Sequence, residues 1–186
     1  MKMPKGKKRE LVAEGSYPAI AKVVADLGTQ QPKNEKFEAK RALMILWEIP
    51  ELGEKGSPVY IQQRLPLSST SKNLKKFLKT WKGIDANDVA DFDPADILNG
   101  TAEIDVVHSE DGEYANVDYV RPYKGKALKG FMDSVSCFLE KGEFDQESFE
   151  ALPEWIQNLA IESEEFMAVS KEKKAVSKSA PKRGKK

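Results

Sequence analysis

The stretch that decides the fold is YIQQRLPLSSTSKNLKKFLKTWKG, residues 60–83. Its first part alternates apolar and polar side chains, which is typical of a strand that is buried on one face. A run of hydroxyl residues follows and can cap a helix. Apolar residues then recur with helical spacing, at Leu74, Phe77, Leu78 and Trp81. Because Gly83 ends this pattern, the stretch predicts a strand followed by a helix whose apolar stripe faces the core.

Two strands are predicted before this stretch. Residues 17–27 combine β-branched side chains with a turn signal at Gly28. In residues 37–49 apolar side chains recur at every second position, whereas Lys40 falls on the alternate face. Arg41 lies on the apolar side, so we expect it near the open end of its strand.

The elements after the helix complete a barrel-like order. Residues 92–100 predict a short helical turn capped by Asp93, and residues 101–108 and 114–122 predict two strands joined by an Asp-Gly hairpin. Three strands, a helix and two strands form the order of a mainly β, five-stranded Greek-key barrel of the OB type, with its helix between strands three and four. An SH3-like barrel and an open α+β sheet use similar elements, and both stay open.

Charge divides the chain, although its formal net charge is zero. Both ends are basic, and the region after the last predicted strand is acidic. In that region residues 131–139 predict an amphipathic helix, and residues 144–161 predict two short helices separated at Pro153. We therefore expect a basic flexible arm at 1–13, an OB-fold domain at 14–125, an acidic helical extension at 126–169 and a disordered basic tail at 170–186.

The sequence gives no support for catalysis. It lacks phosphate-binding glycine motifs and a GxSxG motif, and a lone His108 and a lone Cys137 cannot build a zinc site of several His and Cys ligands. The acidic residues at 110–113 lack the spacing of a calcium loop, which also disfavours a metal-dependent nuclease. We expect no enzyme, no metal and no cofactor.

The lone cysteine cannot form an intrachain disulfide, and the first residues lack the apolar run of a secretory signal. These features favour an intracellular protein. The longest strongly apolar run, residues 42–47, is too short to cross a bilayer, so we expect no membrane association.

The outer face of strands two and three is the candidate binding surface, because an OB barrel binds oligonucleotides there, between its strand 1–2 and 4–5 loops. Binding of a single strand needs cations along the phosphates and aromatic rings on which bases stack. Side chains of these kinds and one amide lie on or beside this face, namely Lys40, Tyr60, Gln62, Arg64, Tyr114 and Arg121, with Lys33 and Lys36 in the first loop. An ordinary half-exposed sheet shows similar residues, and the lysines of the helix fit a solvated face.

Six segments, taken in order, resemble a family of phage single-stranded DNA-binding proteins that are often labelled replication proteins. They are GSYPAIAKVVADLGTQ, KFEAKRALMILWEIPE, VYIQQRLPLSSTSKNLKKFLKTWKG, FDPADILNG, VVHSEDGEYANVDYVRPYKG and FDQESFEALPEWIQ. The resemblance implies an OB fold, single-stranded DNA as ligand, no catalysis and a role in phage replication or recombination in the bacterial cytoplasm. It also implies that Arg64 and Lys72 contact DNA, and that Trp81 and Gly83 are structural.

The leading hypothesis is a single-stranded DNA-binding protein in which Lys40, Arg64, Lys72 and Arg121 hold the backbone while Tyr60 and Tyr114 stack on bases. The competing hypothesis is a protein-interaction module that recruits replication proteins through the barrel and the acidic residues 143–165. The sequence leaves a homo-oligomer open in either case.

Overall fold

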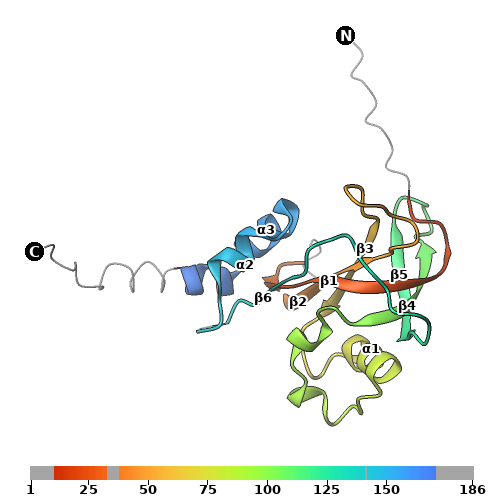
Figure 1. The fold of residues 1–186 in the computed structure, drawn as a ribbon. Coiled ribbons are helices and arrows are strands. Elements are labelled where there is room, and N and C mark those ends of the chain that lie inside the picture. The colour runs from red at the N-terminus through yellow and green to blue at the C-terminus, as the bar shows by residue number, and fades with distance from the viewer. Residues whose placement is uncertain (1–10, 33–37, 141, 171–186) are drawn as a thin grey trace, which may run out of the picture.

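The structure is a computed structural model that describes residues 11–32, 38–140 and 142–170 (Figure 1). Most of the predicted basic arm and tail, together with Lys33 and Lys36, lie outside the described residues. The protein is mainly β, with one six-stranded sheet and several short helices. Its strands are β1 (Gly15–Gln30), β2 (Lys40–Glu48), β3 (Tyr60–Pro66), β4 (Thr101–His108), β5 (Ala115–Pro122) and β6 (Val135–Cys137).

The strands follow the order β3-β2-β1-β4-β5, and all neighbours on this path are antiparallel. The short β6 runs parallel to β1, beside Val23 to Ala25. β3 and β5 are the two ends of the path, and no hydrogen-bonded pairing joins them among the described strands. The sheet is therefore open, so the expected closed barrel is not confirmed.

The strand β1 is longer than expected, because it continues through Gly28. This glycine has a φ of 65°, and the pairing of β1 with β2 shifts register between Asp26 and Thr29. The Gly28 amide donates to Asp26 Oδ1 at 2.8 Å. Gly28 thus forms a bulge inside the strand instead of the predicted turn.

The helix α1 (Lys72–Lys82) confirms the prediction from its apolar spacing. The Ser71 hydroxyl accepts from the Leu74 amide at its start, and Gly83 ends it in the left-handed conformation with a φ of 72°. Its buried stripe packs against one face of the sheet. There Trp81 lies with its ring centroid 5.2 Å from that of Trp47, and its indole Nε1 donates to the Thr101 carbonyl at 2.9 Å.

Short helical segments complete the chain. Two 3₁₀ helices, Val89–Asp91 and Pro94–Ile97, connect α1 to β4, and the Asp93 side chain caps the second as predicted. The C-terminal helices are α2 (Gln146–Glu150), α3 (Glu154–Ile161) and a helical run at 164–170, with Pro153 between α2 and α3. None of the helices in the described ranges is long and apolar enough to span a bilayer.

The predicted helix at 131–139 is wrong. Residues 131–139 are not helical, and they contain the strand β6. Ser134, Val135, Ser136 and Cys137 all have modest helix propensity, and the free backbone of β1 offers this segment a parallel partner. Strand pairing therefore outweighs the apolar spacing.

Two apolar clusters lie on opposite faces of β1 and β2. The first fills the space between the sheet and α1, with Leu43, Ile45 and Trp47 from β2. The second places Ala42, Met44 and Leu46 beneath the C-terminal segment. Residues 126–140 and 142–170 are named the C-terminal cover below, and most of their apolar side chains therefore pack on the face of the sheet away from α1 (Figure 1).

Carboxylates hold the C-terminal cover in place. Glu48, fully buried, accepts from the Phe131 and Met132 amides at 2.6 and 3.1 Å. Buried Asp26 accepts from the Leu139 amide at 3.1 Å and forms an ion pair with Arg41. In the opposite direction, Glu165 of the cover accepts from the Thr29 amide at 2.8 Å. The cover is therefore bound to the sheet by polar contacts as well as by apolar packing.

Candidate nucleic-acid interface

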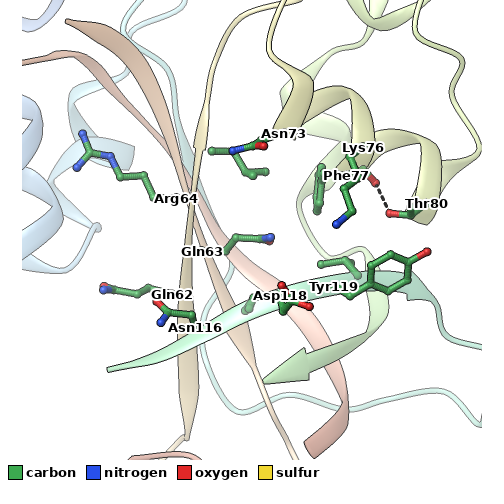
Figure 2. Close-up of a pocket in the computed structure, with 13 residues that line it drawn as sticks. Gln62, Gln63, Arg64, Asn73, Lys76, Phe77, Thr80, Asn116, Asp118 and Tyr119 are labelled. Carbon is green, nitrogen blue, oxygen red and sulfur yellow. Dashed lines mark hydrogen bonds between the residues drawn. The ribbon is translucent and has the colours of Figure 1, made fainter. Parts of the chain in front are cut away.

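A groove of about 410 Å³ lies between β3, α1 and β5, at the open side of the sheet (Figure 2). Its volume is within the ~300–1,000 Å³ of typical ligand sites. It is lined by Gln62, Gln63, Arg64 and Leu65 of β3, by Asn73, Lys76, Phe77 and Thr80 of α1, and by Asn116 to Val120 of β5. The consecutive elements β3 and α1 and the more distant β5 thus build one concave surface.

Several polar side chains of this groove have no hydrogen bond or ion pair to another described residue. They are Gln62, Arg64, Asn73, Asn116 and Asp118. Gln63 differs, because its Oε1 accepts from the Trp47 indole Nε1 at 2.9 Å. This contact fixes the amide and leaves its NH₂ group as a donor for the groove.

A cation and an aromatic ring meet on the α1 side. Lys76 Nζ lies 5.6 Å from the centroid of the Tyr119 ring, within the range of a cation–π contact. The Phe77 ring is buried at this wall, and the Thr80 hydroxyl donates to the Phe77 carbonyl at 3.2 Å (Figure 2). The wall therefore combines positive charge with apolar surface.

Two of the predicted residues of β3, Gln62 and Arg64, belong to the groove lining, and Tyr60 lies beside them on the same strand. Tyr60, Gln62 and Arg64 are exposed on one face of the strand, with 36% of Tyr60 accessible. Figure 2 shows Arg64 and Gln62 on the opposite side of β3 from Gln63, as the alternation of a strand requires. These three side chains form a continuous exposed row along β3, which we name the β3 row.

Three further predicted residues are exposed but belong to other parts of the surface. Lys40 is the first residue of β2, Lys72 is the first residue of α1, and Tyr114 precedes β5 with 60% of its surface accessible. None of them lines the groove.

Arg121 lies in an ion-pair network on β4 and β5. Its guanidinium donates to Asp105 Oδ2 at 2.7 Å and also pairs with Glu103. The hydrogen bonds to Asp105 and then Glu103 raise the pKa of Arg121 above its usual value. The bond from Arg121, followed by the bond from the Ser16 hydroxyl, lowers the pKa of Asp105. The charge of Arg121 is thus balanced inside the protein.

The C-terminal cover narrows the surface that we expected for DNA. The outer side chains of β2 that stand beside the β3 row are Met44, Leu46 and Glu48, and all three are buried. Of the face that we expected to bind DNA on strands two and three, only the β3 row and Lys40, the first residue of β2, are therefore accessible.

The sequence interpretation missed the α1 and β5 walls of the groove. Lys76 fits a solvated face in the sequence, and Asn116 and Asp118 carry no sequence signal for binding. The sequence of α1 does indicate a polar wall, because Asn73, Lys76 and Thr80 follow helical spacing and so form a polar stripe beside the apolar stripe of the core.

The described part of the chain contains no group of three or more His, Cys, Asp or Glu side chains that could hold a metal ion. The groove offers hydrogen-bonding amides, two cations, one carboxylate and aromatic surface. No family model matches the chain, and no curated protein or solved structure matches it either. The resemblance to phage single-stranded DNA-binding proteins stays a prediction.

Proposed function

We propose that this protein binds single-stranded DNA along the β3 row and in the groove between β3, α1 and β5. The observation that carries the proposal is the composition of the groove. Lys76 supplies positive charge beside the Tyr119 ring in the groove, and Arg64 supplies positive charge on the outer side of β3 (Figure 2). Cations for phosphates and rings for bases are the two requirements of single-strand binding.

The strand order supports an OB-type barrel as the scaffold. The path β3-β2-β1-β4-β5, with α1 between β3 and β4, brings the two end strands to either side of one groove. OB barrels are partly open, so an unpaired seam between β3 and β5 is compatible with this fold. We propose the OB-type assignment on this ground.

A single strand fits the surface better than a duplex. Exposed rings at Tyr60 and Tyr114 offer stacking surfaces, which only unpaired bases can use. Tight duplex binding relies on a broad cationic surface. The two groove cations are accompanied here by Asp118, and the formal charge of the whole chain is zero.

The biological role follows from the resemblance. We propose that the protein binds DNA without catalysis, protecting or organising single strands during phage replication or recombination in a bacterial cytoplasm. Arg64 and Lys72 would hold phosphates, with Lys40 extending the path beyond β3.

The acidic surface of the C-terminal cover supports a second candidate, a protein-interaction module. Ile161 and Met167 are 45% and 48% exposed among acidic residues. Such apolar residues could meet a replication partner. A pull-down with and without nuclease separates the two, because partners bound through DNA disappear after digestion and direct partners remain.

Fluorescence anisotropy with labelled oligo-dT at low salt tests the main proposal. Binding should be measurable, and the double variant Tyr60→Ala, Arg64→Ala should weaken it at least about tenfold, because it removes a stacking ring and a phosphate contact, worth roughly 1–3 kcal/mol per stacked base. Lys79→Ala is the matched control, since Lys79 is exposed, lies outside the groove and pairs with Asp85. No binding by the native protein, or equal affinity of the double variant, contradicts the proposed site.

A further inference from the structure

Asp118 is an unexpected residue for a groove that binds a polyanion. It is exposed, lines the same groove as Arg64 and Lys76, and pairs with no cation among the described residues. A carboxylate near the phosphates would weaken binding through like-charge repulsion. Its position is better explained if it faces a base, because ionised carboxylates accept hydrogen bonds from base N–H groups.

We propose that the groove contains a base site that prefers guanine, with Asp118 as the residue that determines the preference. The inference rests on the proposed function, because it names the base that the single-stranded DNA would place in this groove. Guanine presents two adjacent donors, N1–H and the N2 amino group, which match the two oxygens of one carboxylate. Thymine has one N–H between two carbonyls, whereas adenine and cytosine each place an amino donor beside a ring acceptor.

Gln63 supplies the complementary donor. Its Oε1 is engaged by the Trp47 indole, so its NH₂ group is the part that remains for a ligand. Guanine also carries an acceptor, O6, next to its N1–H donor. The Gln63 NH₂ group can donate to O6, while the two carboxylate oxygens of Asp118 accept from N1–H and the N2 amino group. Both residues line the same groove (Figure 2).

The remaining wall suits the body of a nucleotide. The Tyr119 ring provides aromatic surface, and Lys76 lies beside this ring. A volume of about 410 Å³ is in the range of small-ligand sites, so the groove has room for a nucleotide.

The test compares labelled oligonucleotides of ~12 nucleotides, within the range that one OB fold covers. One is all dT, and the others replace a single central dT by dG, dA, dC or deoxyinosine. One dG should tighten binding about tenfold, because a bidentate contact to a base is worth ~1–3 kcal/mol of discrimination. Deoxyinosine lacks the N2 amino group and should lose most of this gain.

Asp118→Asn should remove the guanine preference, so that the dG and dT strands bind with equal affinity, because the neutral amide no longer offers two acceptors. Asp96→Asn is the matched control, since Asp96 is exposed and lies outside the groove. Equal affinity for the dG and dT strands, or a preference that persists in Asp118→Asn, overturns the inference while leaving single-strand binding intact. No binding to any of these strands overturns both the inference and the proposed function.

Discussion

At the scale of single residues, the buried carboxylate of Asp26 connects three parts of the chain. It is 1% exposed, and it pairs with Arg41 of β2 while accepting the Leu139 amide of the C-terminal cover. The hydrogen bond to Asp26 is the largest cause that raises the pKa of Arg41, and it outweighs burial, which lowers it. Because the carboxylate cannot reach water, its negative charge is stabilised only by partners inside the protein.

Arg41→Met should destabilise the protein by about 3–5 kcal/mol, because it leaves Asp26 buried without its cation. The comparison is Arg121→Met, which breaks the ion-pair network with Glu103 and Asp105, whose side chains are about one-third exposed. This substitution should lower the free energy of unfolding by only roughly 0–1 kcal/mol. Urea unfolding followed by tryptophan fluorescence measures both. Equal losses would show that the Asp26 pair has no special role.

The pKa of Asp105 leads to a pH-dependent prediction. Because its pKa is lower in the folded protein, Asp105 stabilises the fold above its unfolded value of 3.8, and this contribution is lost as pH falls through the lower folded pKa. Asp105→Asn should therefore lose less stability than the native protein between about pH 5 and about pH 2. Thermal melts across this range check the prediction, and parallel curves for the two proteins would contradict it.

The ion pair of Asp26 and Arg41 also shows a limit of prediction from sequence, because the sequence does not reveal contacts between strands. The sequence shows that Arg41 departs from the apolar pattern of β2, but it does not reveal its partner Asp26, which lies on another strand. Pairing between strands depends on register, and the bulge at Gly28 changes that register. The exposed positions of Tyr60, Gln62 and Arg64 were predictable, because strand alternation alone determines them.

At the scale of elements, the two-sided burial of β2 explains the role of the C-terminal cover. The run ALMILW at 42–47 is apolar on both faces, as in strands covered on both sides. One face meets α1 and the other meets the cover. Without the cover, a large apolar patch of the sheet would face water.

Ile156→Ala should lower the free energy of unfolding by about 2–5 kcal/mol, because this α3 side chain is fully buried in the apolar cluster between the sheet and the C-terminal cover. Ile161→Ala, in the same helix but 45% exposed, should change stability by less than about 0.5 kcal/mol. Urea unfolding measures the pair. A similarly small effect at both positions would mean that the cover contributes little to folding stability.

Local signals were sufficient for most elements, including α2 and α3 on either side of Pro153, and insufficient for the segment at 131–139. Caps and spacing predicted α1, and alternation with an Asp-Gly turn predicted β4 and β5. The apolar spacing at 131–139 favoured a helix, yet this segment contains β6 because of a distant partner on β1. The groove was only partly predictable, because β5, which forms its third wall, is far from β3 and α1 in sequence.

At the scale of the whole molecule, a net charge of zero conceals an uneven distribution. The C-terminal cover is acidic, while Arg64, Lys72 and Lys76 lie on β3 and α1. A small number of cations of this kind favours salt-sensitive binding to a few phosphates over strong attraction to any polyanion.

The affinity for oligo-dT should therefore fall as salt rises. Each phosphate contact contributes a slope of about −0.7 to the dependence of log K on log salt for a single strand. Arg64→Ala should reduce the slope by about 0.7, and Lys79→Ala should leave it unchanged. A slope that is identical in Arg64→Ala would remove Arg64 from the phosphate path.

The central claim is that single-stranded DNA occupies the β3 row and the groove. Titration of the ¹⁵N-labelled protein with oligo-dT, followed by NMR, tests both binding and location. The account predicts shifts in the amides of β3, in those of α1 around Asn73 and Lys76, and in those of β5 from Asn116 to Tyr119, with small shifts in α2 and α3. An unchanged spectrum, or shifts concentrated in the C-terminal cover, would contradict it.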